Sequence, residues 1–291
     1  MERRRLGTSD LDITPVGVGT APIGSLPGTW WVNWGTQDEG DAIRAIHTAL
    51  DAGVNWIDTA PFYGWGRAEE IVGRALRGRD DTLVFTKCGT FRREDGDDYM
   101  DLRPESVRAD VEASLRRLGR EQVDLLQPHD RDPRVPVEET WGAVLDLVAE
   151  GKVRHGGLSN HRPEEIERAL AVGPVASLQH QYSYLARDVE NEILPLALAR
   201  GLGVIVWAPL GSGFLIDGFD VEALEPGDFR RTHPFAERDL DAARRELREL
   251  GGSAAHGALR WVLSNTAVTG AIVGVRNERE AAELASIGSP A

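Results

Sequence analysis

Residues 38–64, DEGDAIRAIHTALDAGVNWIDTAPFYG, contain the pattern that decides the fold. Over Asp38–Ala52 apolar residues recur at helical spacing, and Gly53 follows where a helix ends in left-handed geometry. The next residues, Asn55–Ala60, are typical of a short buried strand. A helix followed directly by a strand is the unit from which parallel sheets are built.

The same unit recurs along the whole chain. Short β-branched runs predict eight strands, at Val16–Ala21, Asn55–Ala60, Leu83–Lys87, Val123–His129, Val153–Ser159, Ala176–Gln181, Gly203–Trp207 and Val268–Val273. Segments of helical period predict eight helices, near Asp38–Ala52, Ala68–Leu76, Glu105–Leu118, Val137–Ala149, Pro163–Leu170, Glu190–Ala199, Asp239–Leu250 and Glu278–Ala285. Arg103 and Arg162 are each followed by a proline and a glutamate, a pair typical of the first turn of a helix. Gly119, Gly151 and Gly201 mark helix ends.

The 291 residues are enough for two domains, but no linker, low-complexity segment or change of composition divides them. We therefore expect one domain over residues 1–291. Eight strand–helix units in one α/β domain of this length predict a closed (β/α)8 barrel, the TIM barrel. An open, doubly wound parallel sheet is the alternative.

The composition argues against several kinds of partner. The chain has 33 Lys and Arg against 47 Asp and Glu, a formal net charge of −14 at pH 7, so we expect it to bind neither nucleic acid nor a membrane. Its single cysteine, Cys88, forms no disulfide within the chain. No apolar run follows the charged residues Met1–Arg5, and the longest apolar stretch, Gly203–Ile216, is too short for a membrane span. These features predict a cytoplasmic protein.

The sequence lacks several common motifs. Neither Gly-x-Gly-x-x-Gly nor Gly-x-x-x-x-Gly-Lys-Ser/Thr occurs, which argues against a Rossmann dinucleotide site and a P-loop. His155 and His161 flank one strand end and are candidate metal ligands, but without a His-Glu-x-x-His motif a surface or supporting role is favoured. We expect no bound metal. The run 157–161, GLSNH, lacks the last glycine of a nucleophile elbow, which disfavours a serine hydrolase.

Three segments do not fit the alternation of strands and helices: Gly24–Trp34, Arg92–Asp101 and Leu215–Phe235. Each follows a predicted strand, so in a barrel all three rise over the C-terminal face, where active sites lie. The first contains Trp30, Trp31 and Trp34, which either line a pocket or pack within the loop.

Chemically useful residues follow consecutive strands. Asp58 and Lys87 end two of them, and such a buried pair is tolerable where either charge alone is costly. Tyr63, close to that ammonium, is expected to have a pKa below its usual value of about 10 and to serve as a general acid. His129 is placed to hydrogen-bond a carbonyl oxygen. Each residue alone has a packing explanation, but the four together suit carbonyl reduction, in which hydride reaches carbon and a proton reaches oxygen.

The chain is identified as a member of the aldo-keto reductase superfamily, of the bacterial, NADPH-dependent type, by two stretches. RRLGTSDLDITPVGVGT (4–20) resembles the family's opening hairpin and first strand, and GVNWIDTAPFYG (53–64) resembles its signature. The resemblance spans nearly the whole chain and implies a (β/α)8 barrel with an N-terminal β-hairpin. It implies reduction of aldehydes or ketones to alcohols with NADPH, by the catalytic residues Asp58, Tyr63, Lys87 and His129, with Tyr63 as general acid.

The resemblance also implies a nicotinamide site without a Rossmann fold. Ser159 and Asn160 match residues that hold the carboxamide, and Gln179 matches a third. Trp207 stands where the family stacks an aromatic ring on the nicotinamide. The loop over the pyrophosphate then contains Pro209, Leu210, Gly211, Ser212, Gly213 and Leu215, with backbone N–H groups near Gly211, Ser212 and Gly213 as donors.

The adenosine end departs from the family pattern. Residues 274–284, GVRNEREAAEL, resemble the family segment that holds the adenosine end of the cofactor. The resemblance implies that Gly274, Arg276, Glu280 and Glu283 bind the cofactor. Arg276 implies a contact with the 2′-phosphate. Glu280 replaces the usual Gln or Arg, and Leu284 replaces the usual Asn. Arg276 therefore predicts NADPH as the cofactor. A carboxylate close by repels a phosphate but accepts a hydrogen bond from a free ribose hydroxyl, so Glu280 makes NADH the alternative.

The chain ends at Ala291, whereas family members usually continue with a tail over the substrate pocket, so we expect an open pocket. Its expected lining is aromatic: Trp30, Trp31, Trp34, Phe62, Trp65 and Phe91. The expected partner is a small carbonyl compound or alcohol. Two alternatives are a cofactor-binding regulatory subunit of a larger complex and a lyase that uses Lys87 as a Schiff base.

Overall fold

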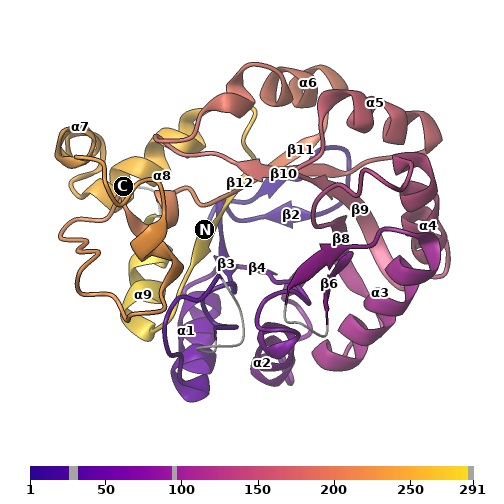
Figure 1. Ribbon diagram of the computed structural model, residues 1–291, viewed down its shortest axis with the longest axis horizontal. Helices are drawn as coiled ribbons and strands as arrows, with labels where there is room; N and C mark the ends of the chain where they lie inside the picture. The colour runs from indigo at the N-terminus through magenta and orange to yellow at the C-terminus, as the bar shows by residue number, and fades with distance from the viewer. Residues whose placement is uncertain (26–31, 94–96, 288–291) are drawn as a thin grey trace.

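The computed structural model describes residues 1–25, 32–93 and 97–287. Within these residues, eight strands pair in parallel and close into a barrel surrounded by helices (Figure 1). In barrel order the strands are β3 (Val16–Gly19), β4 (Trp56–Asp58), β5 (Leu83–Cys88), β8 (Val123–Pro128), β9 (Val153–Ser159), β10 (Ser177–Gln181), β11 (Gly203–Trp207) and β12 (Gly270–Gly274). The predicted (β/α)8 barrel is confirmed, and the open sheet is excluded.

The described residues form nine helices, one more than the sequence predicts. They are α1 (Glu39–Asp51), α2 (Arg67–Ala75), α3 (Pro104–Leu118), α4 (Val137–Ala149), α5 (Pro163–Val172), α6 (Ile193–Arg200), α7 (Asp241–Gly251), α8 (Ala254–Ser264) and α9 (Glu278–Ile287). The additional helix is α8, which Ser253 caps by accepting the N–H of His256 at 3.2 Å. Its Gly257 gives a weak helical signal, but a Cβ there would lie 1.8 Å from the carbonyl oxygen of Leu247, so the glycine lets α7 and α8 touch.

Two hairpins lie outside the barrel sheet. β1 (Arg4–Arg5) pairs antiparallel with β2 (Asp12–Ile13), which confirms the predicted N-terminal hairpin. Its Leu6, Leu11 and Ile13 are fully buried beneath the barrel. The second hairpin, β6 (Thr90–Arg92) with β7 (Asp98–Met100), occupies part of the segment after β5 that the sequence left irregular.

The interior of the barrel has two layers. The lower layer is apolar and contains Trp56, Phe85, Leu125, Ile205 and Ile272, packed on the N-terminal hairpin. Because side chains alternate along a strand, the residues two positions further on also face inward, and there the side chains become polar. They are Asp58, Lys87 and Gln127 on β4, β5 and β8, with Gln179 on β10 at the same level. The polar layer therefore faces the C-terminal mouth.

The helix ends follow the sequence signals. Gly53, Gly119, Gly151 and Gly201 all have left-handed backbone, with φ between 65° and 99°, as their positions predict. None of the described helices is long and apolar enough to span a bilayer.

Candidate active site

An ion pair lies at the centre of the polar layer. Lys87 Nζ is 2.5 Å from Asp58 Oδ1 and donates to the carbonyl oxygen of Thr59 at 3.1 Å. Both side chains are buried, with exposed fractions of 1% for Lys87 and 2% for Asp58. Burial alone lowers the pKa of Lys87, but the charge of Asp58 reverses this and raises it. Lys87 therefore stays an ammonium, which disfavours the Schiff-base alternative.

Gln179 completes this centre from the opposite wall of the barrel. Its Nε2 donates to Asp58 Oδ2 and to Gln127 Oε1, both at 2.9 Å. β10 and β4 are four strands apart in the ring of eight, so the bond to Asp58 crosses the barrel interior. The second carboxylate oxygen of Asp58 is thus satisfied, which fixes the orientation of its ion pair with Lys87.

Tyr63 lies in the loop after β4, with Lys87 Nζ 5.2 Å from the centroid of its ring. Two glycines position its backbone. A Cβ on Gly24 would lie 2.6 Å from the carbonyl oxygen of Tyr63, and a Cβ on Gly64 would lie 2.0 Å from the carbonyl oxygen of Gly24. Gly64 also has φ +62°, so a side chain at this position is strained as well as blocked.

The predicted lowering of the pKa of Tyr63 is wrong. Its pKa is raised above 10, because burial of the phenolate outweighs the attraction of the Lys87 ammonium, and the charge of Asp58 adds to the rise. The sequence places the cation next to the phenol but does not reveal how completely the ring is buried. A protonated phenol at neutral pH is suited to give up a proton rather than to accept one.

His129 follows β8, and its backbone N–H donates to the carbonyl oxygen of Cys88 at 2.9 Å. Its ring meets that of Tyr63 edge to face, with centroids 5.7 Å apart. Burial and the nearby Lys87 ammonium hold the pKa of His129 well below 6.5. Its Nδ1 is buried and has no hydrogen-bond partner among the described residues. A neutral imidazole with an unsatisfied nitrogen is suited to bind a polar ligand atom.

Replacing Gly24 with Ala is expected to lower kcat by about tenfold to a hundredfold, because the added methyl displaces the Tyr63–Gly64 segment. The free energy of unfolding is expected to fall by roughly 1–3 kcal/mol. The matched control is Gly142→Ala in α4, where an added Cβ meets nothing within 4 Å. Steady-state kinetics and urea unfolding of both variants measure the effect. Wild-type kcat in Gly24→Ala would show that this contact does not position Tyr63.

The three residues expected to bind the carboxamide lie together at the mouth. Ser159 Oγ is buried without a hydrogen-bond partner among the described residues. Asn160 donates to the carbonyl oxygen of His129 at 3.0 Å and accepts from Trp207 Nε1 at 3.1 Å. Gln179 uses only its amide N–H groups in the bonds above, so its Oε1 remains an acceptor. A hydroxyl donor beside an amide acceptor is the set that a carboxamide requires, so these residues fit the nicotinamide group.

Backbone strain is concentrated at the same mouth. Among the described residues, four that are not glycine have positive φ: Trp65, Asn160, Ala208 and Ser212. Each lies in a loop that follows a barrel strand, on the side of Asp58 and Lys87. Such conformations persist where surrounding structure enforces them, and they cluster at functional sites.

The aldo/keto reductase family model matches residues 22–289. The chain belongs to this family. A probable aldo-keto reductase 1 of Glycine max is 35% identical, over 89% of this chain and 76% of its own length. The aldo-keto reductase YhdN of Bacillus subtilis is 32% identical, over 99% of this chain and 88% of its own length.

Two solved structures resemble this aldo-keto reductase closely. The glycerol dehydrogenase AKR11B4 of Gluconobacter oxydans superposes with a TM-score of 0.85 and 31% identity, over 100% of this chain and 91% of the other. The holo form of the aldo-keto reductase AKR11C1 of Bacillus halodurans superposes with a TM-score of 0.82 and 29% identity, over 100% of this chain and 92% of the other. Family and fold together make the chain an oxidoreductase of the class that reduces carbonyl groups with a nicotinamide cofactor.

The loop after β11 provides fewer backbone donors than the sequence suggests for this reductase. Gly211 N–H donates to Ala208 O at 2.9 Å and Gly213 N–H to Leu210 O at 3.1 Å, so both are used within the loop. Leu215 is fully buried against α7 and α8, so its side chain faces away from the mouth. The remaining expected residues of this loop are Pro209, which is buried, and Leu210 and Ser212, which are both half-buried.

At the adenosine end, the guanidinium of Arg276 is held by the loop before α1. Its Nε donates to Gln37 Oε1 at 3.1 Å and its Nη2 to the carbonyl oxygen of Thr36 at 2.7 Å. The carboxylate of Glu280 accepts from the Arg276 backbone N–H at 2.8 Å and from Asn277 Nδ2 at 2.9 Å. Glu280 thus stabilises the start of α9. Glu283 is exposed, and Gly274 ends β12 against Pro22.

The expected substrate residues lie around Tyr63. Phe62, Trp34 and Trp65 form one apolar cluster with its ring, and the centroid of Phe62 is 5.6 Å from that of His129. Phe91 instead packs on Tyr99 within the β6–β7 hairpin, at 5.8 Å between centroids. Trp30 and Trp31 lie outside the described residues.

Sequence reasoning missed Gln127. The only signal for it was a polar residue at an inward position of the strand VDLLQP, where an apolar side chain is usual.

Proposed function

We propose that this aldo-keto reductase reduces aldehydes or ketones to alcohols with NADPH, or alternatively NADH, and that Tyr63 is the proton donor. The observation that carries the proposal is the meeting of Tyr63, His129 and the Asp58–Lys87 pair beside the unpartnered hydroxyl of Ser159. A proton donor, a carbonyl-orienting group and a carboxamide site thus share one buried mouth.

Each group has a distinct task. The bound dinucleotide supplies the hydride that reaches the carbonyl carbon. The Tyr63 hydroxyl delivers a proton to the carbonyl oxygen, and the neutral imidazole of His129 orients that oxygen by a hydrogen bond. The Lys87 ammonium stabilises the phenolate left on Tyr63, and Asp58 keeps Lys87 in place. The alcohol leaves, and water restores the phenol proton.

The residues that would hold the dinucleotide extend from the barrel centre to its rim. Ser159, Asn160 and Gln179 suit the carboxamide, and Trp207 offers a flat ring beside them. Arg276 is the reason to favour NADPH, because its guanidinium matches the geometry of a phosphate.

The aromatic cluster of Trp34, Phe62 and Trp65 favours an apolar aldehyde. One solved relative is a glycerol dehydrogenase, so a small polyol is the competing substrate class. The test is oxidation of NADPH, and separately of NADH, by the purified protein with an aromatic aldehyde and with glyceraldehyde. We expect turnover with a higher kcat/KM for the aromatic aldehyde. Absence of turnover with every cofactor–aldehyde combination would contradict the proposed reaction.

Replacing Arg276 with Ala is expected to raise the Kd for NADPH by about tenfold to a hundredfold, the value of a charge-assisted phosphate contact, and to leave NADH nearly unchanged. Arg279→Ala is the matched control, because Arg279 is an exposed arginine three residues further along the chain, in the first turn of α9. Quenching of intrinsic tryptophan fluorescence measures both constants. Equal effects on NADPH and NADH would remove Arg276 from the 2′-phosphate site.

A further inference from the structure

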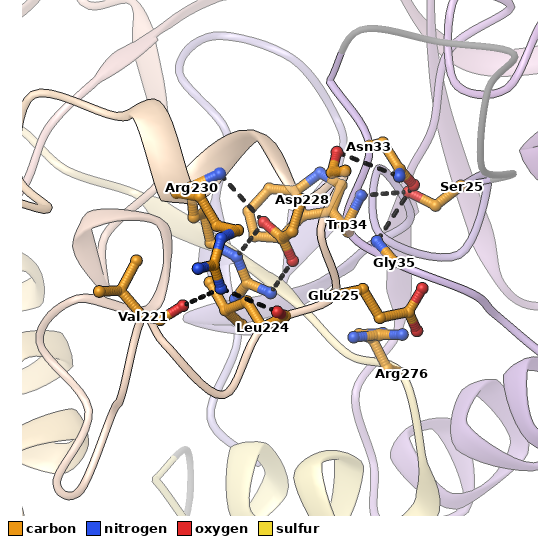
Figure 2. A network of polar contacts seen from close by, with 12 residues as sticks. Ser25, Asn33, Trp34, Gly35, Val221, Leu224, Glu225, Asp228, Arg230 and Arg276 are labelled. Carbon is orange, nitrogen blue, oxygen red and sulfur yellow. Dashed lines mark hydrogen bonds and ion pairs between the residues drawn. The ribbon is translucent and has the colours of Figure 1, made fainter.

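The two arginines Arg230 and Arg231, between β11 and α7, are neutralised within the chain. Arg230 Nη2 lies 2.5 Å from Asp228 Oδ2, as Figure 2 shows. Arg231 Nη2 lies 2.8 Å from Glu222 Oε2. A second group of arginines lies on the outside of the barrel, where α2 and α3 end, and most of its members lack such partners.

A cavity of about 530 Å³ lies between the ends of α2 and α3. Gly73 lets the two helices touch there: a Cβ on it would lie 2.6 Å from the carbonyl oxygen of Arg117 and 2.9 Å from that of Leu118. Both helices run back from the C-terminal mouth of the barrel, so their last turns lie at its opposite end. The cavity is therefore at the far end of the barrel from Tyr63.

The lining of this cavity is basic, although the chain as a whole has a formal net charge of −14. Five lining residues are arginines and two are acidic, which leaves an excess of three positive charges. The arginines are Arg74, Arg77, Arg116, Arg117 and Arg120, and the acidic residues are Glu70 and Asp80.

Two of the five arginines are held by carboxylates outside the cavity lining. Arg117 Nε donates to Glu69 Oε2 at 2.6 Å, and Arg74 Nε lies 2.7 Å from Glu39 Oε1. The other three form no ion pair with any residue that the structure describes; they are Arg77, Arg116 and Arg120. Their positive charges are left for a ligand.

Helix dipoles account for only part of this group. A positive side chain is favoured in the last turn of a helix, and Arg74, Arg116 and Arg117 occupy such positions. Arg77 and Arg120 instead follow the last residues of α2 and α3. Like charges that gather without counterions repel one another, so their grouping is better explained by an anionic ligand than by folding.

The size and charge of the cavity favour an anion with more than one phosphate. Its volume falls within the roughly 300–1,000 Å³ of small-molecule sites. A guanidinium presents N–H groups at the spacing of phosphate oxygens. A single phosphate ester carries about −1.5 to −2 at pH 7, which is less than the excess positive charge of the lining. A chain of two or three phosphates matches that charge better.

We propose that the cavity between α2 and α3 binds an oligophosphate anion, either a free di- or triphosphate or the phosphate chain of a nucleotide. Arg77, Arg116 and Arg120 are the residues that contact its oxygens. The site goes beyond the proposed function and does not depend on it, because it lies outside the barrel and at the opposite end from the dinucleotide site.

The test is calorimetric titration with sodium triphosphate and, separately, with ATP, in buffer without divalent cations. Sodium chloride at about 0.15 M limits the Debye length to about 8 Å and so suppresses general attraction to the surface. We expect one equivalent of each ligand to bind the wild type. In the double variant Arg77→Gln/Arg116→Gln, both Kd values are expected to rise by about tenfold to a hundredfold. Both side chains are exposed, so the variant is expected to fold.

The matched control is the double variant Arg245→Gln/Arg279→Gln. Both arginines are exposed, and neither forms an ion pair with a described residue, so the change in charge and in accessibility is the same. They lie on α7 and α9, away from the cavity lining. We expect this variant to keep the wild-type Kd values. The titration is also repeated at saturating NADPH, which should leave them unchanged.

Four results would overturn the inference. They are absence of binding by the wild type, unchanged Kd values in Arg77→Gln/Arg116→Gln, an equal loss in the control variant, and competition by NADPH, which would place the anion in the cofactor site. Tighter binding of ATP than of triphosphate would support a nucleotide as the source of the phosphates, and equal binding would support a free oligophosphate. Triphosphate binding in this cavity without any carbonyl reduction would contradict the proposed function alone.

Discussion

Tyr63→Phe is expected to lower kcat for carbonyl reduction by about 10³-fold, the usual value of a positioned general acid. The substitution removes only the hydroxyl, so the ring keeps its contacts with His129 and the aromatic cluster. The Kd of the cofactor should therefore stay within a factor of about two. Single-turnover kinetics with NADPH and fluorescence titration measure the two quantities. A variant that retains more than about a tenth of wild-type kcat would assign the proton to another group.

The pH profile of the wild type follows from the same residue. Reduction needs the protonated phenol, and because burial raises the pKa of Tyr63 above 10, that form dominates through neutral and mildly alkaline pH. kcat for reduction should thus be nearly constant between about pH 6 and 9. Alcohol oxidation needs the phenolate, so its kcat should rise with pH over the same range. A reduction rate that falls between pH 6 and 8 would indicate an acid of lower pKa.

The fold was predictable because its signals are local and repeated. Eight β-branched runs, each followed by a helical segment, define the barrel, and glycines such as Gly119 and Gly201 end helices where the sequence indicates. α8 was missed because Gly257 acts through a contact between helices rather than through its own propensity. The residues next to Gly257 in the sequence do not indicate that it packs closely against Leu247.

In the candidate site too, some features follow from local sequence signals and others depend on how the folded chain packs. Asp58, Lys87 and His129 were predictable because the ends of parallel strands meet at one mouth. The direction in which the pKa of Tyr63 shifts was not predictable from the sequence, because it depends on how far the effect of burial exceeds that of the nearby Lys87 ammonium. The hydrogen bond from Phe229 N–H to the carbonyl oxygen of Asn33 joins two loops that are about 200 residues apart in sequence, and no local pattern predicts it.

Lys87→Met is expected to lower the free energy of unfolding by about 3–5 kcal/mol, because it leaves the Asp58 carboxylate buried without its cation. Replacing Asp58 with Asn as well removes the unpaired carboxylate charge and should restore most of the lost stability. The double variant Asp58→Asn/Lys87→Met is therefore expected to be more stable than Lys87→Met alone. Urea unfolding measures both. The matched control is Lys152→Met, which removes a more exposed ion pair with Glu112 and should cost less than about 1 kcal/mol.

Catalysis should not return with stability in the double variant. Without the Lys87 ammonium, the phenolate left on Tyr63 after proton transfer has no nearby positive charge, so kcat is expected to stay at least about 10²-fold below wild type. This split distinguishes a catalytic cation from a structural one. If kcat recovered together with stability, the ion pair would serve only to hold the barrel, and the assignment of Lys87 to proton transfer would be wrong. If Lys87→Met were no less stable than Lys152→Met, the buried pair would not exist in solution as it does in the structure.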